Sequence, residues 1–359
     1  MDLRRYVTLA FAGALAVSAS SCGRGSSLPA TAPAQMAPLA ADQAVDNPSV
    51  LKGLTKQLVI GSTIDPKFGQ QNPYGLTVAP ATAGAFTAGD LAICNFNDKK
   101  NVQGTGYTIV ALHAKPGSKP TLVLADKKLL QGCDALALAP DDTIWAADFG
   151  ANDNPVISSS GKLITNITGK PLNHPFGQIF AAPLHGSPAF YETNAADGTV
   201  YRINLGASFT FTKVASGLAV NHGKPGSILG PSGLAYDPKI DTLYVVDGAA
   251  GNGVGAVYAI ANVSTKPAMH TVFSGPPLSG PISSALLYNG NLVVGNTTNP
   301  NGKNLMVELS PKGKVLAMKN VDKGTAGAIF GMVATGTNAA NTKLYFNDDN
   351  GNNVQVLEK

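Results

Sequence analysis

Asp134, His174 and His222 are the residues whose side chains could carry acid–base chemistry or hold a metal ion. A carboxylate beside one or two imidazoles can transfer protons near neutral pH or ligate a divalent metal. The three residues are separated by 40 and 48 positions, so only the fold could bring them together. The alternative is that both histidines are loop residues whose ring nitrogens are satisfied by local hydrogen bonds.

Short motifs with a known catalytic mechanism are missing from the sequence. The chain has no Gly-x-Ser-x-Gly nucleophile elbow, no His-Glu-x-x-His zinc motif and no Gly-Lys-Ser/Thr phosphate loop. We therefore predict no cofactor and no evident catalytic set. Calcium is kept as an alternative, because the carboxylate and amide oxygens of the loops are ligands that it prefers.

Cys94 and Cys133 are the two cysteines in the part of the chain that is expected to fold. An exported protein meets oxidising conditions, so the pair could form a disulfide between two neighbouring structural units. The alternative is that each is a small buried apolar residue. The sequence leaves both interpretations open.

The elements that must position these residues are short strands in a repeated order. In the clearest copy, residues 231–262 with the strand that follows, strands are expected at 233–236, 242–246, 256–260 and 269–273. The first is stopped by Asp237-Pro238, and a Gly-rich loop separates the second from the third. The second strand is apolar at consecutive positions, which indicates that both of its faces are covered.

Six copies of this order, the clearest one included, run through the chain. Successive second strands end 53, 46, 53, 49 and 51 residues apart, at Asn95, Asp148, Asn194, Asp247, Asn296 and Asn347. Repeats of this length with four short strands are typical of a β-propeller. We predict an all-β fold, a six-bladed β-propeller of four-stranded antiparallel blades, over residues 51–359.

The last copy ends after its third strand, and residues 57–62 form a strand-like run that precedes the first copy. We therefore expect this N-terminal strand to pair with residues 353–357 and to complete the last blade. Such closure removes the open flank that an incomplete ring would expose.

The six residues that end the second strands have two interpretations. They could form a polar rim that binds a ligand or a cation, or they could cap turns by bonding nearby backbone groups. Their recurrence at one repeat position favours structural turn caps, because a binding site should break the symmetry of the repeat.

Residues that break the repeat are expected where the opening strands meet the mouth of the central channel, on the face that collects the polar loops after the second strands. Together with the two histidines they form the candidate ligand mouth: Tyr74, Asp134, His174, Phe176, His222, Ser232 and Ser283. Aromatic rings beside a few polar groups suit the capture of a sugar, a peptide or another partly apolar ligand.

The units resemble NHL-type repeats of six-bladed propellers through Gly233-Leu234-Ala235, the Asp237-Pro238 turn and the strand that ends at Asp247. The resemblance implies the fold but no single activity, because such propellers include scaffolds, binding modules and enzymes. Calcium-dependent lactonases of the gluconolactonase and paraoxonase type share the six-bladed fold and bind their metal through a Glu, Asn residues and an Asp near the channel mouth. Of that set, only Asp134 has a match here.

Residues 1–21 are typical of an export signal, with Arg4 and Arg5 before an apolar stretch that is too short to span a membrane. The residues around Cys22 resemble a bacterial lipobox, which makes Cys22 the expected lipid attachment site; the alternative is ordinary cleavage after Ala19. Residues 22–50 are rich in Ala, Pro, Ser and Gln, a composition that predicts a flexible tether.

A net charge of +4 with only 13% charged residues argues against nucleic acid as a partner. We expect a monomer, secreted or held in the bacterial cell envelope (periplasm or outer membrane), with membrane contact only through an N-terminal lipid. The predicted function is binding of an unknown protein, glycan or small-molecule ligand, or scaffolding. The alternative is a channel-mouth hydrolase or lyase of the gluconolactonase and paraoxonase class.

Overall fold

The computed structural model describes residues 47–206, 208–223, 230–298 and 303–359. The expected export signal, Cys22 and most of the expected tether lie outside the described residues. The compact unit spans Asp46–Lys359. Within its described part, the helical elements are α1 (Ala250–Gly253) and a 3-10 turn at Leu51–Gly53, and no helix is long and apolar enough to cross a membrane.

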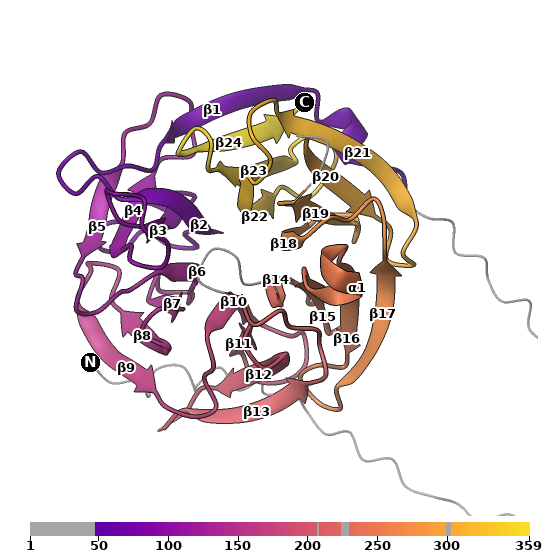
Figure 1. The fold of residues 1–359 in the computed structure, drawn as a ribbon, viewed down its shortest axis with the longest axis horizontal. Coiled ribbons are helices and arrows are strands. Elements are labelled where there is room, and N and C mark those ends of the chain that lie inside the picture. Colours follow the sequence, from indigo (N-terminus) through magenta and orange to yellow (C-terminus); the bar gives the residue numbers. More distant parts are fainter. Residues whose placement is uncertain (1–46, 207, 224–229, 299–302) are drawn as a thin grey trace, which may run out of the picture. The chain divides into compact units, whose positions relative to one another are not determined.

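In the described ranges, twenty-four strands form six antiparallel sheets of four strands, which stand as blades around a central axis (Figure 1). Blades one to three contain β2 (Gln71–Val78), β3 (Leu91–Asn97), β4 (Thr108–Leu112) and β5 (Thr121–Ala125); β6 (Cys133–Leu138), β7 (Ile144–Asp148), β8 (Asp153–Ile157) and β9 (Leu163–Thr168); β10 (Pro175–Ala181), β11 (Ala189–Asn194), β12 (Thr199–Asn204) and β13 (Thr210–Ala215). The predicted six-bladed all-β propeller is confirmed.

Blades four to six repeat the arrangement. They contain β14 (Pro231–Asp237), β15 (Thr242–Asp247), β16 (Ala256–Ala261) and β17 (Ala268–Ser274); β18 (Pro281–Leu286), β19 (Leu292–Asn296), β20 (Asn304–Leu309) and β21 (Val315–Asp322); β22 (Ile329–Thr335), β23 (Lys343–Asp348), β24 (Asn353–Glu358) and β1 (Lys56–Ser62). The first strand of each of blades one to five, and β22 of blade six, lies innermost (Figure 1).

The ring is closed by β1, as the sequence predicted. This strand pairs antiparallel with β24, from Lys56 opposite Glu358 to Ser62 opposite Asn353. The Lys56 ammonium also lies 2.9 Å from the Glu358 carboxylate. First and last blades are therefore joined by a shared sheet.

An apolar cluster lies at each of the six interfaces between neighbouring blades. The second strands β3, β7, β11, β15 and β19 are buried at every position, which explains their runs of consecutive apolar residues. Between blades two and three, for example, Trp145 stacks on Phe190 with ring centroids 4.0 Å apart. Stability therefore comes from the contact between blades, since one blade alone would expose both faces.

The propeller unit begins a few residues before the predicted boundary at residue 51. Glu308 is fully buried, and its carboxylate accepts hydrogen bonds from the Val50 N–H at 2.9 Å, the Leu51 N–H at 3.0 Å and the Ser49 hydroxyl. Asn291 donates a further hydrogen bond to it at 2.8 Å. A buried carboxylate is costly without hydrogen-bond partners, and residues 49–51 supply three of the partners of Glu308. These residues are therefore held on blade five and do not belong to the tether.

We predict that deleting residues 51–62 lowers the melting temperature by roughly 10 °C or more, since the deletion removes three fully buried side chains, Leu51, Leu54 and Ile60. It also leaves the edge of β24 unpaired. Circular dichroism melting of the deleted and intact proteins measures the change. Lys56→Ala, which removes only an exposed ion pair, is the control and should shift the melting temperature by little. An unchanged melting curve of the deletion variant would contradict the closure.

Candidate functional site

Each inner strand carries a β-bulge at the point where it begins. The residue before the bulge pairs with the last residue of the second strand in blades two to six, and with Asn95, two residues before the end of β3, in blade one. The pairs are Pro73 with Asn95, Cys133 with Asp148, Pro175 with Asn194, Pro231 with Asp247, Pro281 with Asn296 and Ile329 with Asp348. The next residue is the equivalent bulge residue of each blade: Tyr74, Asp134, Phe176, Ser232, Ile282 and Phe330. Bulges re-aim side chains, and five of these six residues line the central channel, Ser232 being the exception.

This register corrects three sequence-based assignments. In blade five the bulge residue is Ile282 and not Ser283, because Ser283 takes the place that Gly75, Gly177, Gly233 and Gly331 occupy in four other blades. Phe330, the bulge residue of blade six, was missed. In the same blade Asp348, and not Asn347, stands at the turn-cap position. The repeats could have shown these shifts if they had been aligned on the residue that follows the bulge.

The residue after the bulge must be small because neighbouring inner strands approach closely there. A Cβ atom on Gly177 would lie 1.7 Å from the Ser232 carbonyl oxygen, and one on Gly331 would lie 2.2 Å from the Tyr74 carbonyl oxygen. Both distances are far inside van der Waals contact. The close approach of the inner strands therefore fixes where the bulge side chains point.

Aromatic bulge residues fill one end of the channel. The plug, as we call this cluster, consists of Tyr74, Phe96, Phe149, Phe176, Ala195, Ile282 and Phe330, each at most 8% exposed. The Tyr74 ring stacks on Phe330 and on Phe96, with centroids 4.1 and 4.4 Å apart. Its faces are thus occupied, contrary to the expectation that Tyr74 offers an open aromatic face to a ligand.

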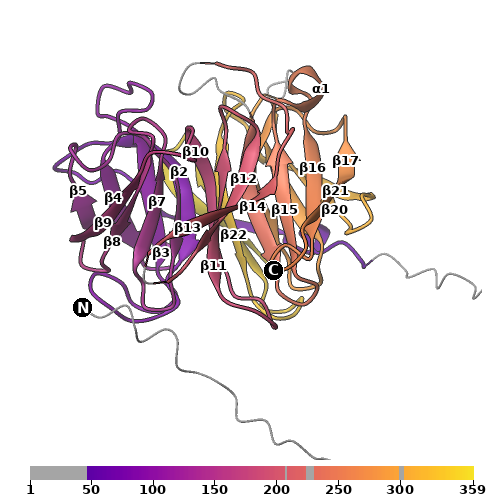
Figure 2. The ribbon, with the colours of Figure 1, turned by 90° about the horizontal axis from the view of Figure 1, so that it is seen from below.

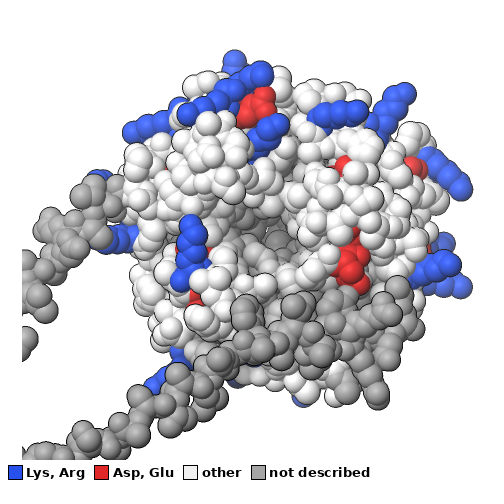
Figure 3. All heavy atoms as spheres, turned by 180° about the vertical axis from the view of Figure 1, so that it is seen from behind, with Lys and Arg blue, Asp and Glu red and all other residues white. Residues whose placement is uncertain are grey.

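The plug lies toward the face that carries α1 (Figure 2). Phe96 is the penultimate residue of the second strand β3, Phe149 directly follows the second strand β7, and α1 comes shortly after the second strand β15. Below it, the channel holds a cavity of about 320 Å³ lined by the inner strands. The cavity extends from Asp134 and the plug to Pro80 and Pro140, which are exposed at the far ends of β2 and β6. The face opposite α1 is hollowed near its centre, and its Lys and Arg side chains lie mostly toward the rim (Figure 3).

This geometry places the mouth on the face opposite the predicted one. The sequence suggested an opening among the polar loops that follow the second strands, but aromatic side chains from four blades converge there and fill the channel. Tyr74, Asp134, Phe176 and Ser283 line the cavity as expected, together with Gln178 and Ser284, which the sequence did not indicate.

Asp134 is the acidic residue that the cavity wall contains. It is 4% exposed, and neither carboxylate oxygen has a hydrogen-bond partner among the described residues. Burial raises the pKa of Asp134 well above its ordinary value, and the nearby Asp148 carboxylate raises it further. In the absence of a cation, the channel therefore favours the neutral carboxylic acid at this position.

Further uncompensated polar atoms lie in the same cavity wall. The Gln178 side-chain oxygen and the hydroxyls of Ser283 and Ser284 have no partner among the described residues. The Gln178 amide donates a hydrogen bond of 3.0 Å to Glu192, which lies behind it and also accepts one from Asn154. Burial raises the pKa of Glu192 to about 8, against the lowering effect of those hydrogen bonds.

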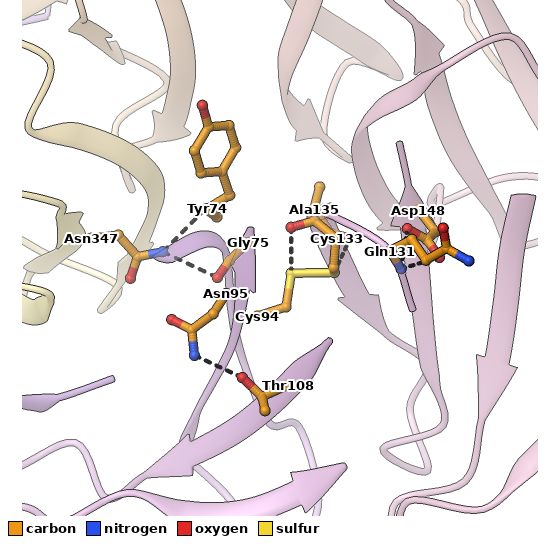
Figure 4. Close-up of a disulfide and its surroundings, with 10 residues drawn as sticks. All are labelled: Tyr74, Gly75, Cys94, Asn95, Thr108, Gln131, Cys133, Ala135, Asp148 and Asn347. Carbon is orange, nitrogen blue, oxygen red and sulfur yellow. Dashed lines mark hydrogen bonds between the residues drawn. A yellow bond between two sulfur atoms is a disulfide. The ribbon is translucent and has the colours of Figure 1, made fainter. Parts of the chain in front are cut away.

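The start of β6, which carries Asp134, is held against blade one by a disulfide. Cys94 and Cys133 form this bond with their Cα atoms 5.9 Å apart (Figure 4). On the other side of blade one, the Asn347 amide donates hydrogen bonds of 3.1 Å to the carbonyl oxygens of Tyr74 and Gly75 (Figure 4). Asn347 therefore joins blade six to blade one and caps no turn.

The cap residues at the ends of the second strands bind the segment that enters their own blade. Asp148 accepts the Gln131 N–H on both oxygens at 2.9 Å, and Asp247 accepts the Ala219 N–H at 2.7 Å. The amide oxygens of Asn194 and Asn296 accept the Asn173 and Ser279 N–H groups at 3.1 Å. The Asn95 amide instead donates to the Thr63 carbonyl oxygen at 3.0 Å. All five are at most 1% exposed, so these side chains clamp connections between blades and do not form an accessible rim.

The two candidate histidines and Ser232 lie away from the cavity. The His174 ring packs on Phe149 at 4.6 Å, on the plug, and its Nδ1 lies 3.1 Å from the Phe149 carbonyl oxygen. His222 is exposed, and neither histidine lines the cavity. The Ser232 hydroxyl donates to the Val246 carbonyl oxygen at 3.3 Å. The structure thus does not bring Asp134, His174 and His222 into one site.

The residues around Asp134 do not fit a calcium ion. Calcium takes six to eight oxygen ligands, several of them charged, whereas Asp134 is the one carboxylate that the described residues contribute to the cavity wall. Among the described residues, no group of three or more His, Cys, Asp and Glu side chains could hold a metal ion.

Comparison with known proteins gives the fold alone. No family model matches the sequence, and neither does any curated protein. Among solved structures, a gluconolactonase from Xanthomonas campestris matches with a TM-score of 0.57 and 17% identity, over 84% of this chain and 89% of its own.

Two other solved structures are similar at the same level. Regucalcin from Agrobacterium tumefaciens, a calcium-binding protein, has a TM-score of 0.56 and 15% identity over 84% of this chain and 95% of its own. A catalytically inactive virginiamycin B lyase from Staphylococcus aureus with quinupristin has a TM-score of 0.53 and 16% identity over 85% of each chain. The NHL-type assignment of the repeats stays a prediction.

We predict that Glu192→Gln weakens the loss of stability at high pH. The folded protein holds the Glu192 proton up to about pH 8, whereas the unfolded chain releases it near pH 4.5. Between these values folding takes up a proton, so this residue makes stability fall as pH rises. A Gln carbonyl oxygen can accept the same two hydrogen bonds without the charge.

The measurement is the melting temperature of both proteins at pH 5 and pH 9. The fall between the two pH values should be smaller in the variant by roughly 5 °C or more. Other buried carboxyls, such as Asp148 with a pKa of about 7, act in the same direction in both proteins and cancel in the difference. Identical pH dependence of the two proteins would contradict the neutral state of Glu192.

Proposed function

We propose that this protein is a binding protein that takes a small, largely apolar molecule into its central channel through the face opposite α1. The observation that carries the proposal is the cavity of about 320 Å³ with one buried, unpartnered carboxyl group in its wall. Ligand sites of this kind are mostly apolar, with a few polar groups that orient the ligand. The volume lies at the lower end of the range for such sites, roughly 300–1,000 Å³.

The wall of the cavity has the corresponding composition. Apolar side chains from all six inner strands, among them Leu76, Leu136, Ile179, Leu234 and Met332, surround the few polar groups. The cavity wall is carried by strands that are paired and packed on both sides, so the site is preformed. Preformed sites lose less binding free energy to ordering of the protein.

A test of the channel uses Thr77, which is half-buried in the cavity wall. We expect 2-phenylethanol to bind the wild-type protein and Thr77→Trp to weaken this binding by roughly tenfold or more, because the indole would occupy the apolar space. Thr77→Val keeps the shape of the residue and should bind the alcohol as the wild type does. Saturation-transfer NMR or calorimetry measures the affinities, and melting curves check folding.

Absence of 2-phenylethanol binding by the wild-type protein would contradict the proposal. Binding that is insensitive to Thr77→Trp would place the ligand outside the channel and would also contradict it.

A second candidate function is a hydrolase or lyase that uses Asp134 as a general acid. The raised pKa of a carboxyl group in a cavity favours it, since general acid catalysis needs a group that keeps its proton near the working pH. Two of the similar structures are also a gluconolactonase and a lyase. Against it, no second carboxylate and no histidine lies beside Asp134 in the part of the cavity wall that the structure describes.

We expect the purified protein to bind calcium no more tightly than roughly millimolar, because one carboxylate is too few for a tighter site. It should show no metal-dependent hydrolysis of lactones or aryl esters. Calorimetry with calcium and a spectrophotometric esterase assay measure both. Micromolar calcium affinity, with esterase activity that Asp134→Ala abolishes, would establish the enzyme instead.

We also propose that the protein is exported and anchored through a lipid on Cys22, on the strength of its N-terminal sequence. Mass spectrometry of the mature N-terminus should find a lipidated Cys22, and Cys22→Ser should move the protein from the membrane fraction to the soluble fraction. An N-terminus at Ser20 with an unmodified Cys22 would contradict the anchor.

A further inference from the structure

We propose that the channel selects an organic amine, with Asp134 as the counter-ion of its ammonium group and the apolar wall as the seat of its carbon skeleton. This inference rests on the proposed function, since it names the class of molecule that the same cavity takes.

Asp134 has no charge partner among the described residues. The residue is 4% exposed, and neither of its carboxyl oxygens is hydrogen-bonded within the described residues. The cavity wall, as the described residues form it, includes no Lys, Arg or His. A buried carboxylate is stabilised only by a cation or by hydrogen-bond donors, so a compensating charge would have to arrive with the ligand.

The titratable groups that face Asp134 among the described residues include an acid and no cation. Asp148 faces it from β7 and Tyr74 from β2, while Cys94 on β3 is bonded to Cys133 and β10 carries no titratable residue. Burial also keeps the pKa of Tyr74 well above its ordinary value, so its hydroxyl stays neutral. The local field thus favours a cation and disfavours an anion.

The cavity wall suits an organic ammonium group better than a metal ion. A primary ammonium group has three N–H donors, and the wall offers suitable acceptors in both Asp134 oxygens and, from the neighbouring strand β10, the Gln178 oxygen. A metal ion needs more oxygen ligands than this wall supplies. The remainder of the cavity is apolar, which suits the carbon skeleton of an amine.

The proton balance gives the pairing a measurable sign. In the empty channel Asp134 favours the carboxylic acid form, whereas pairing with an ammonium requires the carboxylate. The Asp134 proton therefore passes to the solvent when the ammonium binds, and the affinity for a charged amine rises with pH until Asp134 is ionised in the free protein. An amine that itself loses its proton only near pH 10, as a lysine side chain does, stays charged throughout this range.

The experiment compares 2-phenylethylamine with 2-phenylethanol, which differ mainly in the charged head group, on the intact propeller by titration calorimetry at pH 7. We expect the amine to bind roughly tenfold or more tightly than the alcohol, as a charge-assisted hydrogen bond does. Titration in two buffers of different ionisation enthalpy should show proton release with the amine and none with the alcohol.

Two variants assign the effect to Asp134. Asp134→Asn keeps the shape of the side chain and should lower the amine affinity to that of the alcohol, without proton release and without a large change in alcohol binding. Asp126→Asn, the same change at an exposed residue outside the cavity wall, is the control and should keep the preference for the amine. Melting curves verify that both variants fold.

The outcomes distinguish the amine preference from binding in the channel as such. Equal affinities of the amine and the alcohol, both sensitive to Thr77→Trp, would overturn the amine preference and leave the channel as a binding site. An amine preference that survives Asp134→Asn would overturn the assignment to Asp134. Displacement of the amine by millimolar calcium would indicate an inorganic cation site and would overturn the inference as well.

Discussion

Six inner strands converge on one axis, and the crowding at that axis determines the rest of the site. Where the strands approach most closely, the residue after each bulge has to be small, as the short distances around Gly177 and Gly331 show. The bulge itself turns the preceding side chain out of the normal alternation of the strand. The identity of the bulge residue therefore decides whether the channel is filled at that level or carries a polar group.

Of the six bulge residues, three are aromatic, one is aliphatic, and one is a serine that bonds its own sheet. The sixth is Asp134. The aromatic and aliphatic ones gather into the plug because the apolar contact between them removes surface from water. Asp134 stands at the lower boundary of the plug, where the same burial that stabilises its neighbours raises its pKa. The repeat position that holds a packing residue in most blades thus holds, in blade two, the polar group of the cavity.

The contacts between blades keep these bulges in place. Each cap residue of blades one to five ties the end of a second strand to the segment that enters the blade, and the second strand in turn pairs with the residue before the bulge. The disulfide, the Asn347 amide and the shared sheet of β1 and β24 add links around blades six, one and two. On the face opposite α1 the Lys and Arg side chains lie mostly toward the rim (Figure 3), whereas the buried Asp134 lies in the wall of the central channel.

The sequence by itself determined the six blades, their strand order and the closing role of residues 57–62, because these depend on the local alternation of apolar runs and turns that recurs along the chain. It also singled out Asp134, since a carboxylate at a position held elsewhere by Tyr74 or Phe176 breaks the repeat. Only the tertiary structure decided which end of the channel is open, that Ile282 and Phe330 belong to the plug, and that His174 and His222 lie outside the cavity. Those outcomes depend on how side chains from four or more blades pack against one another across the axis, and no local pattern in one repeat records that packing.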